Sequence, residues 1–435
     1  MRTLRKCCLI AAVLLLLGGC SGWKLQPVET LMRPPAPFGE YAPLLKAFQK
    51  KAGVNAVLAI PTGGGTDRGA VRTFDADLDG EDDSALLVYS DGGTDKNLRY
   101  ALYYLVDGDW RFLMDEAGEG KSYVWAKFAD MPGYGSCQVL ICWSTDTAYS
   151  LSILDYKDAK ERAFHTPTVN PIGVIQGEAF SLVDLDADAK QELFYVKRES
   201  ADGIVRSWGI AAVLAEDRLS IKPWAKIPLD GGASGYGETQ VEHMPGGDRL
   251  FINAYKGAAV MFTELIQWDS GQQALADLTI DQQTLINIST LRPAGLLAQD
   301  VNGDGLFEIP VFVDVGDSED AAVLENALQE IAWQQWNADG CEEVFPSILN
   351  MSAGYILRTD KEPLSFCSFV PGRGEGEFSF RLEGKEIFSL AENSENDSGI
   401  HLTNGNKTVT LTITSEGESR GITEGFIKRN LFWRL

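Results

Sequence analysis

Closely spaced carboxylates mark a short segment in which Asp75, Asp77, Asp79 and Asp83 occupy the first, third, fifth and ninth positions and Gly80 the sixth. Alternate side chains of a tight turn bring oxygen ligands together, and Ca²⁺ takes about six to eight of them, often with one backbone carbonyl. Without a cation, two carboxylates a few ångströms apart repel each other by roughly 1–4 kcal/mol. The segment therefore predicts a calcium site, and a solvated acidic turn is the alternative.

The same arrangement recurs twice, each time ahead of an apolar run. The four equivalent positions are Asp184, Asp186, Asp188 and Glu192 in the second segment, and Asp300, Asn302, Asp304 and Glu308 in the third. In the second segment Ala189 stands where glycine is expected in a left-handed conformation. The predicted Ca²⁺ is structural, because every ligand closes a loop. An affinity of roughly 10⁻⁴–10⁻³ M is sufficient outside the cell.

Weaker copies lie halfway between these segments. Residues 130–139 align with residues 300–309 and keep both glycines but lose the carboxylates, and residues 243–252 form a copy with one deletion. We expect neither copy to bind metal. The five copies start at intervals of 54 to 59 residues, close to the roughly 40–50 residues of a four-stranded propeller blade.

The rest of the chain fits an all-β fold. Residues 54–345 read as short strands joined by turns, some of them Asp-Gly pairs that favour tight hairpins. We predict a β-propeller of six or seven blades, five of them detectable as repeats. Residues 346–435 lack the loop motif and are predicted to form a small C-terminal β-rich domain, or instead to supply closing blades.

The N-terminal segment predicts export and anchoring. Residues 1–19 combine three cations with a short apolar run, as a signal peptide does, and the run is too short to span a membrane. The segment from Leu17 to Cys20 resembles the lipobox of bacterial lipoproteins, which implies lipidation of Cys20. Residues 20–53 then form a tether and a short helix over residues 41–52. The resemblance implies a membrane-anchored protein on the extracytoplasmic face.

Charge and cysteine content narrow the possible partners. The formal net charge is −24, which argues against nucleic-acid binding. Cys137 and Cys142 are expected on opposite faces of one strand and so cannot easily pair. For Cys341 and Cys367, a disulfide and two free thiols both remain open.

Catalytic signatures are scarce. His165, His243 and His401 are each expected to be surface or packing residues, and no nucleophile elbow or zinc motif is present. Trp125 is one of several tryptophans expected to pack in strands, with a sugar- or peptide-binding rim as the alternative. We therefore predict that the chain is not an enzyme.

The acidic loops ahead of apolar strands resemble FG-GAP/VCBS repeats, the calcium-loop blades of integrin α-chain propellers. With the lipobox, residues 30–345 look like the VCBS repeat-containing lipoproteins of bacteria. The resemblance implies a calcium-stabilised propeller, and we predict that it serves as a binding or scaffold module for a protein or glycan ligand. The alternatives are an extracellular polysaccharide-acting enzyme on a propeller platform, and an accessory lipoprotein of cell-envelope assembly or export.

Overall fold

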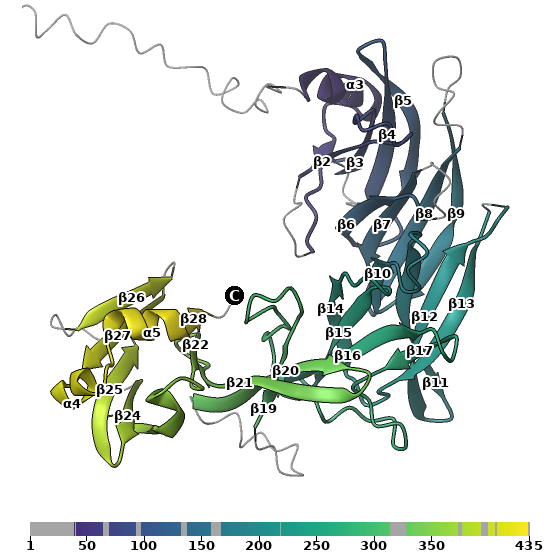
Figure 1. The fold of residues 1–435 in the computed structure, drawn as a ribbon. Helices are drawn as coiled ribbons and strands as arrows, with labels where there is room; N and C mark the ends of the chain where they lie inside the picture. Colours follow the sequence, from purple (N-terminus) through teal and green to yellow (C-terminus); the bar gives the residue numbers. More distant parts are fainter. Residues whose placement is uncertain are drawn as a thin grey trace, which may run out of the picture.

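A computed structural model describes residues 39, 41–63, 69–92, 97–131, 137–157, 167–217, 219–313, 328–372, 376–392, 399–404 and 407–433 (Figure 1). The predicted signal peptide and Cys20 lie outside these residues. Among the described helices, none has the length and apolar character needed to cross a membrane.

The described residues up to Gly177 form two sheets and one helix. Helix α3 (Ala42–Ala52) precedes a sheet of β1 (Val57–Leu58), β2 (Val71–Phe74), β3 (Ser84–Ser90), β4 (Leu98–Val106) and β5 (Asp109–Ala117). The second sheet contains β6 (Ser122–Ala129), β7 (Gln138–Ser144), β8 (Tyr149–Lys157) and β9 (Thr168–Gly177).

Three further sheets follow in chain order. The third contains β10 (Ala179–Val183), β11 (Glu192–Ala201), β12 (Ile204–Leu214) and β13 (Ile221–Leu229). The fourth contains β14 (Gly235–Glu242), β15 (Arg249–Lys256), β16 (Val260–Asp269), β17 (Ala274–Asp277) and β18 (Arg292–Pro293). The fifth contains β19 (Ile309–Phe312), β20 (Leu328–Asn337), β21 (Gly340–Asn350), β22 (Tyr355–Arg358) and the last strand, β28 (Leu431–Trp433).

The C-terminal unit has a sheet of its own. Its strands are β23 (Ser368–Pro371), β24 (Glu377–Leu382), β25 (Lys385–Glu392), β26 (Ile400–Asn404) and β27 (Lys407–Ile413), accompanied by η3 (Leu364–Phe366), α4 (Ser415–Ser419) and α5 (Glu424–Asn430). The strand order β23-β24-β25-β27-β26 differs from the simple meander of the preceding sheets. The predicted β-rich character of this region is confirmed.

The all-β propeller plan is confirmed, because consecutive antiparallel sheets pack face to face along the chain. Five sheets correspond to the five repeats read from the sequence. Figure 1 shows them following one another around an arc, with the first sheet at the top and the C-terminal unit at the lower left, well apart. Among the described residues, no further meander sheet supplies the expected sixth or seventh blade, because the remaining strands belong to the C-terminal sheet.

Apolar clusters between neighbouring sheets hold this arrangement together. Leu86 and Val88 pack with Val139 and Ile141 of the second sheet, and their neighbours in β3 face helix α3. A strand that is covered on both faces reads as a continuous apolar run, which explains why β3 shows no alternation. Burial of such side chains contributes about 1.5–3 kcal/mol each.

Tight hairpins set the strand register. Asp107 and Gly108, between β4 and β5, both have positive φ angles, of 52° and 82°. Two consecutive left-handed residues form the turn whose twist matches that of paired strands. The sequence prediction of an Asp-Gly hairpin is therefore confirmed.

The structure corrects the predicted C-terminal boundary and decides between the two alternatives for Cys341 and Cys367. The predicted domain boundary at residues 345/346 falls inside β21, which pairs with β20 and β22. The fifth sheet therefore continues to residue 358, and β28 returns to it from the end of the chain. Cys341 and Cys367 are both free thiols.

Candidate functional site

The acidic loops occupy equivalent places in the sheets. The first connects β2 to β3, and the second connects β10 to β11. The third precedes β19 and is closed by a bridge between Gln299 and Glu308. Each loop therefore leads directly into a strand of its sheet, which is β3, β11 or β19.

The ninth-position side chain of each loop accepts a hydrogen bond from the second-position backbone N–H. The pairs are Asp83 with Ala76 (3.1 Å), Glu192 with Leu185 (2.9 Å) and Glu308 with Val301 (2.9 Å). In the copy at residue 130, Gln138 accepts the same bond from Met131, at 2.9 Å. This copy keeps the closing hydrogen bond but has a neutral side chain, Gln138, in place of the ninth-position carboxylate.

The first-position carboxylate folds each loop around itself. Asp75 accepts hydrogen bonds from the backbone N–H groups of Leu78 and Gly80, both at 2.6 Å. Asp300 accepts equivalent bonds from Gly303 (2.6 Å) and Gly305 (2.9 Å). The first-position carboxylate therefore closes the turn by accepting hydrogen bonds from the backbone of its own loop.

The sixth position of each loop is left-handed. Gly80 and Gly305 have φ angles of 98° and 88°, and Ala189 has a φ of 65°. The expectation that Ala189 takes the conformation of a glycine is confirmed, with an expected steric cost of about 1 kcal/mol.

Three carboxylates converge in each of the first two complete loops. The ligand atoms of Asp75, Asp77 and Asp79 all lie within 4.8 Å of one another, as do those of Asp184, Asp186 and Asp188. Oδ1 of Asp184 is buried and has no hydrogen-bond partner, so it is available as a ligand. Burial raises the pKa of Glu192, beside this cluster, to about 7.

The third loop is arranged differently. The Asn302 amide nitrogen donates to Asp304 (3.0 Å) and Glu308 (2.9 Å), so an amide group links the acids. Burial raises the pKa of Glu308 to about 7. A cation can bind here only if the Asn302 side chain rotates, so that its amide oxygen faces Asp304 and Glu308 where the amide nitrogen now lies. The donor sets of the first two loops fit a hard divalent cation, and the third fits one after this rotation.

The fourth repeat carries a histidine–aspartate pair in place of the acidic cluster. Nδ1 of His243 lies 2.9 Å from a carboxylate oxygen of Asp248, while the other oxygen accepts the backbone N–H of Asp184 at 3.1 Å. Gly247 allows this close contact, because a Cβ there would stand 2.1 Å from the carbonyl oxygen of Leu185. The fourth loop therefore packs directly on the second acidic loop.

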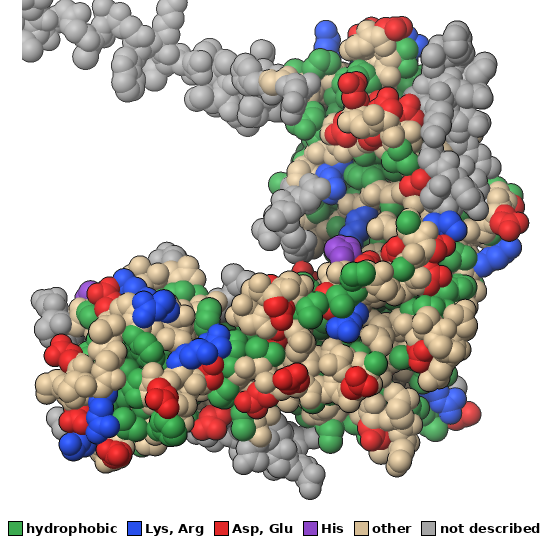
Figure 2. Space-filling view, in the orientation of Figure 1, with side chains coloured by type: hydrophobic (Ala, Val, Ile, Leu, Met, Phe, Trp, Pro, Cys, Tyr) green, Lys and Arg blue, Asp and Glu red, His purple; other side chains and the backbone are tan. Residues whose placement is uncertain are grey.

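A cleft of about 800 Å³ opens on the inner side of the arc. Strands β2, β6, β10 and β14, from four successive sheets, contribute to its walls. Its polar and aromatic lining includes Arg72, Trp125, Lys127, Tyr149, Glu178, Glu238 and His243. Figure 2 shows a hollow in this region with Lys or Arg side chains and a histidine at its surface.

Neighbouring groups hold the charged side chains of the cleft in place. Nζ of Lys127 lies 5.3 Å from the ring centroid of Trp125, and Arg198 pairs with Glu178 at 3.0 Å. Burial is the main cause that raises the pKa of Glu178. Positive charge therefore gathers on the side of the cleft formed by the first two sheets.

Sequence reasoning did not identify this cleft, since its residues come from repeats more than 50 residues apart. One signal was available: Arg72 and Lys127 each stand three residues before the start of a repeat, at 75 and 130. Equivalent positions of a radial repeat face the same way, so two cations at one repeat position predict a shared basic wall. His243, expected to be a surface or packing residue, lies at the cleft and is exposed.

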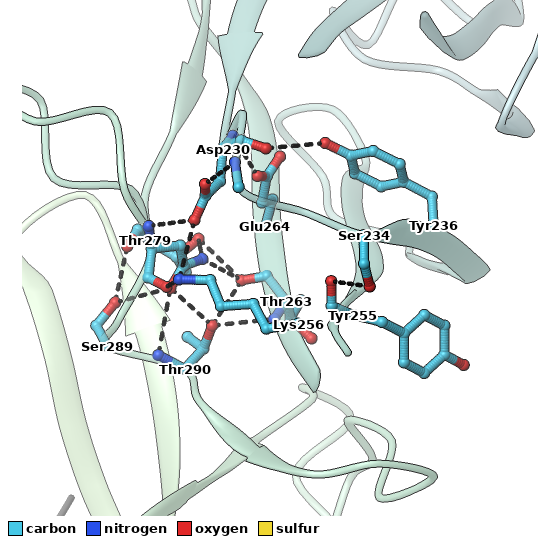
Figure 3. A network of polar contacts seen from close by, with 12 residues as sticks. Asp230, Ser234, Tyr236, Tyr255, Lys256, Thr263, Glu264, Thr279, Ser289 and Thr290 are labelled. Carbon is cyan, nitrogen blue, oxygen red and sulfur yellow. Dashed lines mark hydrogen bonds and ion pairs between the residues drawn. The ribbon is translucent and has the colours of Figure 1, made fainter. Parts of the chain in front are cut away.

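A second group of acids is buried in the fourth sheet and in the connection that precedes it (Figure 3). Oε1 of Glu264 accepts the backbone N–H of Asp230 at 2.7 Å, and Lys256 lies 3.3 Å from Asp230. Asp277 accepts hydrogen bonds from the backbone and hydroxyl of Thr279, at 2.9 and 2.8 Å. Figure 3 shows Lys256 reaching into a network that includes Thr263, Thr279, Ser289 and Thr290. The network is part of the core and does not line the cleft.

Comparison with known proteins shows only distant similarity. No protein-family model and no curated protein sequence matches the chain. A protein from Lactobacillus plantarum is 9% identical with a TM-score of 0.31, covering 82% of this chain and 98% of its own. A rhamnogalacturonan lyase is 14% identical with a TM-score of 0.30, covering 81% and 74%. An α-L-arabinofuranosidase from Fusarium graminearum is 10% identical with a TM-score of 0.29, covering 80% and 93%. At these TM-scores the similarities carry no argument about what this chain does.

Proposed function

We propose that this chain is a calcium-stabilised propeller that binds a glycan in its inner cleft. The observation that carries the proposal is the cleft itself, in which aromatic and polar side chains from four sheets face one space of about 800 Å³. Ligand sites of this size combine apolar walls with a few polar groups that orient the ligand. Trp125 offers an aromatic face, and the surrounding charged groups offer hydrogen bonds to hydroxyls.

Calcium would stabilise the sheets around this cleft and would not bind inside it. The proposed ions are held by the first, second and third acidic loops, which connect the strands of the first, third and fifth sheets. The converging carboxylates and the partnerless oxygen of Asp184 support this assignment. The relation to FG-GAP/VCBS repeats belongs to the same proposal.

Calorimetric titration of the chain with Ca²⁺, combined with thermal melting in EDTA, tests the metal. We expect saturable binding of two or three ions and a melting temperature that falls on chelation. Unchanged melting and no heat of binding would leave the loops as solvated turns.

Glycan binding is tested by screening neutral and acidic oligosaccharides against the wild-type protein and Trp125→Ala. We expect the wild type to bind some of these oligosaccharides and Trp125→Ala to bind none of them. Trp224→Ala is the matched control, because Trp224 stacks on Trp268 outside the cleft. Equal retention by all three proteins would contradict the proposed site.

A second candidate function is a polysaccharide-acting enzyme, and one observation favours it. His243 lines the cleft and contacts Asp248 through Nδ1, so Nε2 is the ring nitrogen left to exchange a proton with a ligand. Incubation of bound glycans with wild type and His243→Ala tests this: shortened products with the wild type alone support catalysis, and intact glycans with both support binding.

We further propose that a lipid on Cys20 anchors the chain to the extracytoplasmic face of a membrane. The support is the lipobox-like sequence, which lies outside the described residues. Mass spectrometry of the protein from a bacterial host, compared with Cys20→Ala, tests it, and a wild type without the added acyl mass would contradict it.

A further inference from the structure

An exposed lysine in the cleft has no carboxylate partner among the residues that the structure describes. Lys127, on β6, forms no ion pair with a described residue, and its ammonium lies over the ring of Trp125. Desolvation by burial lowers its pKa, and the nearby Cys142 thiol opposes that effect. A cation that has lost part of its hydration without gaining an anion is unfavourable. An incoming anionic group would compensate this loss.

Arg72 adds a second positive charge to the same wall of the cleft. The Arg72 guanidinium lies 5.4 Å from the ring centroid of Phe128 and faces the same cleft. The nearby acid, Glu178, is paired with Arg198, which reduces its effect on a ligand. The exposed acid Glu238 and the exposed His243 lie on the part of the lining that β14 and the following loop contribute. The cleft is therefore basic on one side, in a chain whose net charge is −24.

We propose that the cleft binds an acidic polysaccharide, with a sugar carboxylate on Lys127 and a sugar ring against Trp125. This inference rests on the proposed glycan-binding function and names the class of glycan. An ammonium beside an aromatic face matches a sugar that carries one carboxylate on an otherwise hydroxylated and partly apolar ring. Glu238 and His243 then face the sugar hydroxyls across the cleft.

The overall charge favours a polymer of low charge density. A chain with a net charge of −24 repels a dense polyanion such as a nucleic acid. A polysaccharide with one carboxylate per sugar places few charges in the cleft at a time, so a small number of cations is sufficient to bind it.

The test compares one sugar in two charge states. Calorimetry of the full-length protein at low salt measures binding of tetragalacturonate and of its methyl ester, which has the same rings without the charge. We expect the acid form to bind at least about tenfold more tightly, as one charge-assisted hydrogen bond predicts. Its affinity is expected to fall as ionic strength rises.

Two lysine variants locate the effect. Lys127→Gln should weaken binding of tetragalacturonate about tenfold and leave binding of the ester unchanged. Lys226→Gln is the matched control, because Nζ of Lys226 also lies over a tryptophan ring, 3.8 Å from the centroid of Trp208, but outside the cleft. It should leave both affinities unchanged.

The outcomes separate the two proposals. Equal affinity for acid and ester, or equal weakening by Lys127→Gln and Lys226→Gln, would overturn the acidic-glycan inference. If neither galacturonate binds while neutral glycans do, the inference is wrong and the glycan-binding function stands. If no glycan of either charge binds, both are wrong.

Discussion

Two regions of this protein concentrate carboxylates, and they differ in how their charge is balanced. The first and second acidic loops place three aspartates within 4.8 Å on partly exposed turns and contain hardly any basic side chain, apart from Lys190 in the second. Glu264 and Asp277 of the fourth sheet, and Asp230 in the connection that precedes it, are at most 4% exposed and lie beside Lys256. The buried carboxylates therefore have a lysine of the protein, Lys256, as a counter-ion.

The difference shows which region depends on the solution. A buried charge without a partner is strongly destabilising. The charges of the buried carboxylates must therefore be compensated by side chains, backbone donors and bound protons. Exposed loops tolerate uncompensated charge, because water and salt screen it. We therefore expect the buried network to respond to mutation and pH, and the loops to respond to calcium.

The largest expected effect comes from Arg292→Met in the fourth sheet. Arg292 is fully buried and donates hydrogen bonds to Thr290, Leu296, Asn253 and Thr263. Methionine fills similar space but donates no hydrogen bonds. Each buried acceptor left without a donor lowers the free energy of unfolding by about 1–3 kcal/mol. Urea unfolding should show a loss of about 3 kcal/mol or more, whereas the exposed Arg206→Met should change stability by less than about 0.5 kcal/mol. Equal stability of both variants would mean that the network is not maintained in solution.

A pH-dependent effect is expected from Asp277→Asn. Burial raises the pKa of Asp277 in the folded protein from 3.8 to about 6, in surroundings that include Glu264, Asp230 and Lys256. The folded state therefore binds this proton more tightly than the unfolded state. The resulting stability is fully present below about pH 4 and is lost as pH rises through about 6.

Asparagine cannot ionise and keeps an oxygen for the Thr279 donors. Asp277→Asn should therefore be more stable than the wild type at pH 7.5, by about 1–3 kcal/mol, with the difference disappearing at pH 4. Unfolding midpoints measured across this range provide the test. The exposed Asp217→Asn is the control and should keep the wild-type pH profile. A constant offset between wild type and Asp277→Asn at every pH would contradict the assignment.

A smaller, calcium-dependent effect is expected from Asp184→Asn. The change removes charge from the second loop, while the new amide oxygen retains the hydrogen bond from Ala189 seen at 3.0 Å. At a calcium concentration ten times the dissociation constant, one site contributes about 1.4 kcal/mol to stability. In calcium, the melting temperature of Asp184→Asn should rise less than that of the wild type, by the contribution of this one site. In EDTA, the two proteins should have the same melting temperature. Asp281→Asn, in a turn without an acidic cluster, should keep the full rise.

The sequence was informative where a feature repeats. The five loops and their order, the helix before the first sheet and the left-handed Ala189 were predicted, because each depends on residues close together in the chain. The cleft was not predicted, because Lys127, Glu178 and His243 meet only when three different sheets are assembled. The return of β28 to the fifth sheet was missed for the same reason: pairing of Tyr355 with Trp433 joins distant segments without a local signal.

The smallest expected effect comes from Ala189→Gly and tests the loop backbone alone. Ala189 holds a φ of 65° at the position where Gly80 and Gly305 stand in the other two loops. Glycine removes the steric cost of this conformation, about 1 kcal/mol, but gains more freedom in the unfolded chain. The net expectation is a stabilisation of about 0.5 kcal/mol, measured by urea unfolding in EDTA. Gly305→Ala should destabilise by a similar or larger amount. If both changes destabilise, the second loop has adapted to alanine, and the repeats are less equivalent than their hydrogen bonds indicate.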